Sequence, residues 1–277
     1  MRALEQIRRW PVRNSAAGVA DSNGVLATEG DLDRVFALAS VTKLLAAYAV
    51  LIAIEEGAIE LDQPAGPIGS TVRHLLAHTS GLAFDSPVIM AEPGRRRIYS
   101  SSGFEVLAEF LTRETGIAFG EYLHEAVFVP LGMNSSELTG SAGHAAHSTV
   151  GDLLRFAGEL LNPALLPPES LAEATRIQFP GVGGVLPGYG SQRPNDWGLG
   201  FEIRDGKSPH WTGLTNSART FGHFGQSGTF LWVDPDAGAA CVSLSDENFG
   251  DWARFAWPTL SDAVLADIQR IRDTGEK

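Results

Sequence analysis

The spacing at which apolar residues recur changes along the chain. Alternating apolar residues between positions 12 and 28 flank Asp21-Ser22-Asn23-Gly24, a turn sequence that predicts a hairpin of two short strands. A short amphipathic helix is expected before it, over residues 1–10. The segment 40–56 is apolar nearly all round and is followed by Gly57, a pattern typical of a buried helix with a C-terminal glycine cap.

The middle of the chain has helical periodicity interrupted by Pro and Gly. We predict short helices in five segments, 72–78, 103–115, 119–127, 150–160 and 168–174. Residues 179–195 are crowded with Gly and Pro, which predicts a long, mobile surface loop near a functional edge.

Near the C-terminus, the apolar residues again recur at the spacing typical of strands. Short strands are predicted in four segments, 198–203, 220–224, 229–233 and 239–244, before a final helix over 249–272. Strands at both ends with helices between them predict an α+β sandwich: one antiparallel sheet built from both chain termini, flanked by terminal helices, with an inserted helical lobe. We expect a sheet domain of residues 1–60 and 196–277 and a lobe of residues 61–195.

Composition narrows the possible classes of protein. The 277 residues are 44% hydrophobic, which is enough for a filled core, and the formal net charge of −12 argues against a nonspecific nucleic-acid binder. Cys241 is the single cysteine, so an intrachain disulfide and a cysteine zinc cluster are excluded. The N-terminus lacks a signal-peptide pattern, and the longest apolar run, 44–54, is shorter than the ~18 residues of a membrane span. We expect a cytoplasmic protein with no membrane partner.

Ser40-Val41-Thr42-Lys43 is the first candidate for chemistry. A serine and a lysine three residues apart share one face of a helix, and a neutral amine there can take the proton of the hydroxyl. Burial would favour the neutral amine. The chain has three lysines, and one of them is in this apolar helix. The tetrapeptide also fits a helix-capping serine followed by a lysine that extends to solvent.

Further motifs accompany this tetrapeptide in a fixed order. They are FALASVTK at 36–43, TVRHLLAHTSGL at 71–82, IYSSSG at 98–103, PLGM at 130–133 and GHFGQ at 222–226. Together they resemble the serine β-lactamase and penicillin-binding protein superfamily, in particular its branch of class C β-lactamases, D-aminopeptidases and β-lactamase-like esterases. The resemblance runs from about residue 16 to residue 244 and implies the same α/β fold with an inserted helical lobe.

The resemblance also implies roles for individual residues. Tyr99 corresponds to the tyrosine of the second family motif, which relays a proton between the nucleophile and the leaving group. Ser101 stands where the family has asparagine, and the shorter side chain lacks the amide that would bond the substrate carbonyl and the lysine. Efficient β-lactam turnover is therefore less expected.

The third family motif falls at His223-Phe224-Gly225. By analogy, Gly225 lets substrate approach the strand, and the amide N–H of Gln226 joins that of Ser40 as the oxyanion hole. His223 replaces a permanent cation with one whose charge depends on pH, and Phe224 replaces a hydroxyl donor. Both changes weaken recognition of a carboxylate, which favours a neutral ester or amide substrate. Arg219 could restore a cation nearby.

We therefore expect a serine hydrolase that forms an acyl-enzyme on Ser40. Its partner would be a small ester, amide or lactam, with no metal, nucleotide or organic cofactor. A β-lactamase, D,D-peptidase or D-aminopeptidase is the alternative, and a catalytically silent ligand-binding relative is another.

Several other features have competing interpretations. Two histidine pairs, His74 with His78 and His144 with His147, would suit a metallohydrolase, although packing or capping explains them better. Residues 95–97 are three arginines, interpreted as a solvated patch. Trp197 and Trp211 are expected in the core or in the wall of the cleft.

Overall fold

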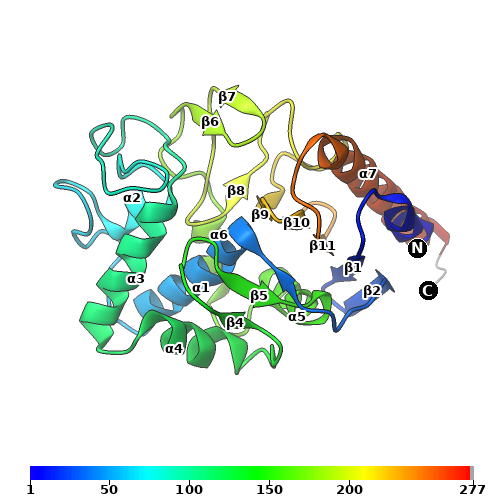
Figure 1. Ribbon diagram of the computed structural model, residues 1–277, viewed down its shortest axis with the longest axis horizontal. Helices are drawn as coiled ribbons and strands as arrows, with labels where there is room; N and C mark the ends of the chain where they lie inside the picture. The colour runs from blue at the N-terminus through cyan, green and yellow to red at the C-terminus, as the bar shows by residue number, and fades with distance from the viewer. Residues whose placement is uncertain (275–277) are drawn as a thin grey trace.

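The computed structural model describes residues 1–274, and its centre is a six-stranded antiparallel sheet in the order β2-β1-β11-β10-β9-β8 (Figure 1). The strands are β1 (Ser15–Asp21), β2 (Gly24–Glu29), β8 (Glu202–Ile203), β9 (Phe221–Gly225), β10 (Thr229–Asp234) and β11 (Ala239–Ser245). The register places Val19 opposite Cys241, so strands from the two ends of the chain pair directly. The predicted fold class and the N-terminal hairpin are confirmed.

Two terminal helices cover one face of the sheet. The 3₁₀ helix η1 (Arg2–Arg9) lies beside the long helix α7 (Asp251–Thr274), as Figure 1 shows. Alternate strand residues, among them Val19 and Cys241, form a buried core with these helices. Cys241 is thus a small buried hydrophobe, and burial raises the pKa of its thiol.

Two helices cover the opposite face, where the larger core lies. Helix α1 (Thr42–Glu55) is buried along residues 42–53, and α5 (Val150–Leu161) packs across β1 and β11. A separate 3₁₀ turn, η2 (Ala39–Val41), precedes α1, so Ser40 lies in this turn and not in the predicted continuous helix.

The remaining elements form the part of the chain predicted as a helical lobe. Its helices are α2 (Val72–Leu76), α3 (Ser101–Thr115), α4 (Phe119–Leu123), the π-helix η3 (His124–Phe128) and α6 (Pro168–Ala174). The sequence did not predict its short strands, which are β4 (Glu137–Leu138), β5 (Ala146–Ser148), β6 (Gly184–Leu186) and β7 (Gly190–Gln192). β5 lies between β4 and β3 (Phe36–Ala37), while β6 and β7 form a hairpin in the predicted loop. Residues 61–195 are thus joined to the six-stranded sheet and its flanking segments by the pairing of β5 with β3 and by the packing of α5 on the sheet.

Within residues 1–274, no helix has the length and apolar character needed to cross a membrane.

Candidate active site

Ser40 lies in the η2 turn, which two side chains of the β9–β10 region hold in place. Thr229 Oγ1 donates a hydrogen bond of 2.8 Å to the carbonyl oxygen of Leu38, and Ser227 Oγ donates one of 2.6 Å to that of Ala37. Ala39 has φ of 46°, a left-handed conformation that costs energy for a residue with a Cβ. The turn therefore presents a partly exposed serine from a constrained backbone.

Lys43 follows one turn later and is completely buried. Its Nζ donates hydrogen bonds of 2.7 Å to the carbonyl oxygen of Gly143 and 3.1 Å to Ser101 Oγ. Burial lowers the pKa of Lys43 to about 7, and the carboxylate of Glu105 partly opposes this shift. Lys43 therefore has a large neutral fraction near pH 7, as a base requires.

Tyr99 lies close to both the serine and the lysine. The centroid of its ring lies 4.7 Å from Lys43 Nζ. Its hydroxyl is buried and, among the described residues, lacks a hydrogen bond of ordinary geometry. Burial raises the pKa of Tyr99, and the nearby Ser40 side chain opposes only part of that increase. The phenol is consequently protonated at rest, which suits a relay that gives up one proton as it accepts another.

Lys43 does not hydrogen-bond to Ser40 in this structure. Both hydrogen bonds of its Nζ go to Ser101 and Gly143, whereas the Ser40 side chain lies near the Tyr99 hydroxyl. The sequence-based picture of direct transfer from serine to lysine is therefore not the arrangement seen. Catalytic hydrogen bonds often tighten only when substrate is bound, and the present geometry favours a path through the phenol.

Ser101 retains one of the two contacts that the sequence comparison expected to be lost. It begins α3, whose N-cap Ser100 accepts a hydrogen bond of 2.9 Å from the N–H of Gly103. This cap fixes the helix start, from which the Ser101 hydroxyl bonds to Lys43. The missing amide therefore removes a potential substrate contact but leaves the lysine held.

His223 lies on β9 and faces Tyr99 and Trp197. Its ring centroid is 5.4 Å from that of Tyr99 and 5.2 Å from that of Trp197. Both ring nitrogens are buried without a hydrogen-bond partner among the described residues. Burial, followed by the positive charge of Lys43, lowers the pKa of His223 to about 3. His223 is therefore neutral at ordinary pH, which corrects the expectation of a pH-dependent cation.

The other residues of the third motif differ in where they point. Phe224 pairs with Phe230 and packs into the core beneath α7, away from the face of His223. Gly225 ends β9 directly against the η2 turn that carries Ser40: a Cβ there would lie 2.2 Å from the carbonyl oxygen of Leu38. Gln226 follows at the surface, and its Nε2 donates to the carbonyl oxygen of Phe249.

Several basic and aromatic residues lie elsewhere than expected. Arg219 pairs with Asp236 on the surface, 2.9 Å apart, and so supplies no cation to the site. Arg97 is buried and donates to carbonyl oxygens in distant segments, so it is a structural residue and not part of a solvated patch. Trp197 contacts Tyr99, whereas Trp211 belongs to the core beneath α7.

The histidine pairs do not form a metal centre among residues 1–274, where no group of three or more potential ligands could hold an ion. His74 contacts Thr71 at 2.9 Å. His78 is buried and accepts a hydrogen bond of 3.1 Å from the N–H of Ser100, which helps to fix the start of α3. Sequence reasoning missed Gly143 and Glu105, because neither lies in a recognisable motif.

Comparison with known proteins now defines the family. A family model described as beta-lactamase matches residues 7–265. The chain belongs to the beta-lactamase family. The resemblance to serine β-lactamases and penicillin-binding proteins is thereby confirmed.

Solved structures that are similar to this protein cover nearly the whole chain. A protein from Mycobacterium bovis, described as a beta-lactamase, has 62% identity and a TM-score of 0.95, with coverage of 96% of this chain and 99% of that one. EstCE1, described as a hydrolase with promiscuous acyltransferase activity, has 18% identity and a TM-score of 0.79, with coverage of 95% and 96%. The latter likeness shows the fold alone.

Curated relatives match over shorter stretches. Penicillin-binding protein 4* of Bacillus subtilis is 27% identical over 139 residues, which are 38% of this chain and 31% of the relative. The D-alanyl-D-alanine-carboxypeptidase/endopeptidase AmpH of Escherichia coli is 25% identical over 147 residues, or 40% and 38% of the two chains. The matched region thus spans about a third of these relatives.

Proposed function

We propose that this beta-lactamase family member is a serine hydrolase that forms an acyl-enzyme on Ser40. The observation that carries the proposal is the buried amine of Lys43, whose pKa of about 7 lies in the range needed for proton transfer. Burying a lysine costs free energy, so its retention in this core is better explained by a chemical role than by packing. Lys43 lies against the Tyr99 ring and three residues after Ser40, which is partly exposed in the η2 turn. This position gives the amine a chemical use.

In the proposed acylation step, Ser40 Oγ attacks the carbonyl carbon of the substrate. The serine proton passes to Tyr99 as the phenol proton moves toward neutral Lys43, and the returning proton goes to the leaving group. Water then repeats the sequence and releases the acid. Backbone N–H groups of Ser40 and Gln226 would stabilise the oxyanion, which is supported by the close contact of Gly225 with the η2 turn.

We further propose a small neutral ester or amide as the preferred substrate. The support is electrostatic: His223 is neutral and Arg219 is engaged with Asp236, so neither supplies a cation for a substrate carboxylate. Lys43 is the remaining basic group of the site, and it is bound to Ser101 and Gly143.

A β-lactamase or D-peptidase is the second candidate. Its support is the relative of 62% identity that is described as a beta-lactamase, together with the hydrogen bond that Ser101 keeps to Lys43. A silent ligand-binding relative is the third possibility, although it would not require a buried lysine of lowered pKa.

One panel separates these candidates. Intact mass is followed after mixing the protein with p-nitrophenyl butyrate, a D-alanine anilide or benzylpenicillin, with Ser40→Ala as control. The proposal predicts a transient acyl adduct, fastest with the ester and absent in Ser40→Ala. Fastest turnover of penicillin would favour the second candidate, and no adduct with any compound would favour the silent one.

A further inference from the structure

A cavity of about 400 Å³ lies between the segment before Tyr99 and the β6–β7 hairpin. Three arginines line it, Arg95, Arg96 and Arg193, and no acidic side chain does. All three are exposed residues, in a chain whose net charge is −12. A concentration of positive charge in an acidic protein favours an anionic ligand.

Other charges leave most of this positive charge uncompensated. Arg95 faces Glu92 at 3.6 Å, but both side chains are largely exposed. Among the described residues, neither Arg96 nor Arg193 pairs with a carboxylate. By contrast, the cavity of about 480 Å³ beside α3 contains Glu109 as well as Arg113. The arginine-lined cavity therefore differs from the cavity beside α3 both in its position and in the net charge of its lining residues.

Hydrogen bonds join the backbone segments around this cavity. The N–H of Arg97 donates to the carbonyl oxygen of Gly183 at 3.0 Å, and the Arg97 guanidinium donates to that of Asn195 at 2.8 Å. The N–H of Asn195 in turn donates to the carbonyl oxygen of Val182 at 3.0 Å. A Cβ at Gly184 would lie 2.1 Å from the carbonyl oxygen of Arg97, so this glycine is needed for the close approach.

These contacts place the two backbone segments that carry the arginines next to one another before any ligand arrives. Repulsion among like charges raises the energy of the empty cavity and is relieved when an anion binds. Guanidinium groups match tetrahedral oxyanions through paired N–H donors, and the Ser191 hydroxyl at the rim adds a further donor. A group with two negative charges fits best.

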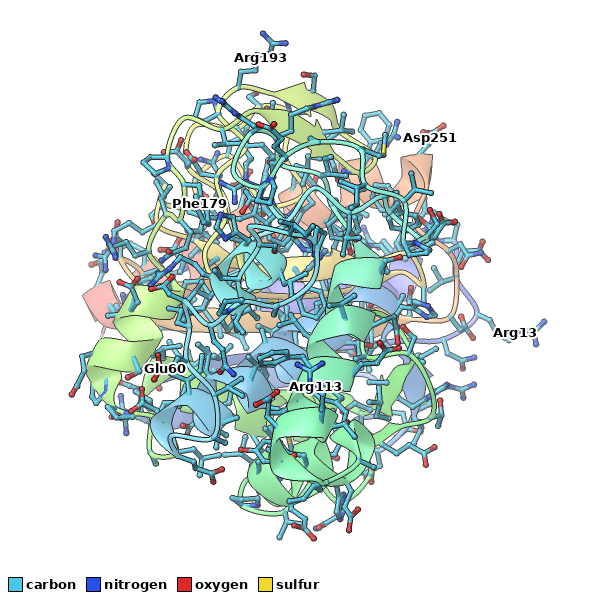
Figure 2. The ribbon with its side chains drawn as sticks, turned by 90° about the vertical axis from the view of Figure 1, so that its left-hand side faces the viewer. Arg13, Glu60, Arg113, Phe179, Arg193 and Asp251 are labelled. Carbon is cyan, nitrogen blue, oxygen red and sulfur yellow. The ribbon has the colours of Figure 1, made fainter. Side chains whose placement is uncertain are left out.

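We propose that this cavity, defined by Arg95, Arg96, Ser191 and Arg193, binds a phosphate group of a small molecule. The site is separate from Ser40, and its occupation does not depend on the hydrolase activity proposed above. Figure 2 shows Arg193 at one extremity of the molecule, well apart from Arg13 and Arg113, which provide matched controls.

The test is calorimetric titration of the full chain with inorganic pyrophosphate, with citrate as an anion of comparable charge. We expect saturable pyrophosphate binding, stronger than citrate binding, that weakens about tenfold or more in the double variant Arg96→Ala/Arg193→Ala. The controls Arg13→Ala/Arg113→Ala and Ser40→Ala should bind as the parent does. Because both arginines are exposed, the double variant should keep the parent's melting temperature.

Four results with the anions and the arginine variants would overturn the assignment. These are no saturable binding, an undiminished affinity in the double variant, an equal loss in the arginine control pair, and citrate binding as tight as that of pyrophosphate. Loss of binding in Ser40→Ala would instead place the anion at the serine and would equally refute a separate site. Failure to hydrolyse any ester would leave this result untouched, so the two proposals fail independently.

Discussion

Lys43 Nζ and the carbonyl oxygen of Gly143 lie 2.7 Å apart, and this hydrogen bond joins α1 to the loop before β5. The same loop lies against Ser101, the second partner of the lysine: a Cβ at Gly143 would be 3.1 Å from the Cβ of Ser101. The position of the buried amine therefore depends on a glycine that belongs to none of the sequence motifs.

The first prediction concerns Gly143→Ala. The added methyl group must displace Ser101 by a few tenths of an ångström, so we expect the acylation rate to fall about tenfold. Gly158→Ala in α5 is the control, because nothing lies within 4 Å of its new Cβ. The control should keep full activity and gain about 0.5–1 kcal/mol of stability. Equal stopped-flow acylation rates for Gly143→Ala and the parent would contradict this role.

The second prediction is a pH dependence set by Lys43. Below its pKa of about 7 the amine is protonated and cannot accept a proton, so kcat/KM should rise through this pH and then level off. The Glu105 carboxylate raises the pKa of Lys43, so Glu105→Gln should move the inflection to lower pH. An inflection unaffected by Glu105→Gln, or one lost in His223→Gln, would assign the titration to another group.

The third prediction concerns substrate charge. His223→Lys should introduce a cation beside Tyr99 and raise kcat/KM for a substrate with a carboxylate relative to its neutral methyl ester, by about tenfold. His223→Gln, which stays neutral, should leave that ratio unchanged. The ratio is measured with one matched pair of substrates, and a parent enzyme that already prefers the carboxylate would contradict the proposed specificity.

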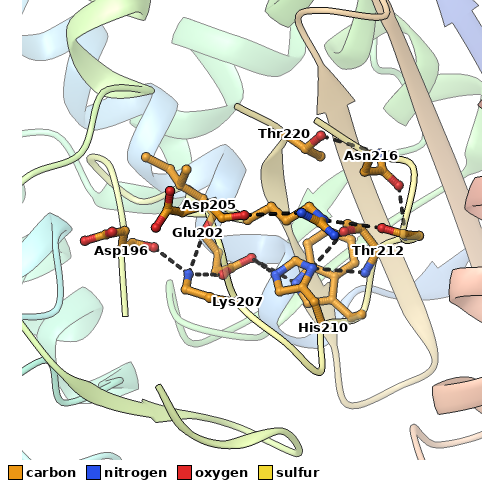
Figure 3. A network of polar contacts seen from close by, with 12 residues as sticks. Asp196, Glu202, Asp205, Lys207, His210, Thr212, Asn216 and Thr220 are labelled. Atoms are coloured by element: carbon orange, nitrogen blue, oxygen red, sulfur yellow. Dashed lines mark hydrogen bonds and ion pairs between the residues drawn. The ribbon is translucent and has the colours of Figure 1, made fainter. Parts of the chain in front are cut away.

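The fourth prediction concerns the buried charge network around Glu202, shown in Figure 3. Glu202 forms an ion pair with Lys207 and accepts hydrogen bonds of 2.9 Å from His210 Nε2 and Trp211 Nε1. Burial alone would raise the pKa of Glu202, but His210 and Lys207 outweigh it and hold this pKa well below its usual range. The carboxylate is therefore charged and fully engaged.

Glu202→Gln would leave the Lys207 ammonium buried without a counter-charge, so we expect a loss of about 3 kcal/mol in the free energy of unfolding. The control Glu29→Gln breaks an ion pair with Arg8, whose side chain is 65% exposed, and should reduce the free energy of unfolding far less, because solvent screens this pair. Chemical denaturation measures both. Similar losses in the two variants would show that the buried network contributes no more to the free energy of unfolding than the exposed ion pair does.

Local patterns were sufficient to predict much of the fold. The turn sequence at residues 21–24 and the apolar run after Ser40 report interactions between neighbouring residues, and both elements are present in the structure. Arg97 was misread because its burial depends on carbonyl oxygens about 20 to 98 positions away, contacts that no local pattern encodes. The network of Glu202 and Lys207 was missed for a similar reason: only the fold removes both charges from water.

In the candidate site, too, local motifs predicted some features while others depend on the fold. Ser40, Lys43 and Tyr99 were identified from motifs, and the structure brings the three side chains together. The direction of Phe224 and the low pKa of His223 could not be predicted, because they depend on which sheet face each side chain occupies and on what covers it.

The most direct test of the account is the site and rate of covalent labelling by a fluorophosphonate, measured by peptide mass mapping with a time course. We predict one phosphonyl group on the peptide that contains Ser40, none in Ser40→Ala with its fold intact, and a labelling rate at least about a hundredfold lower in Lys43→Ala. Label on another residue, or an unchanged rate in Lys43→Ala, would contradict the central claim that the buried amine activates this serine.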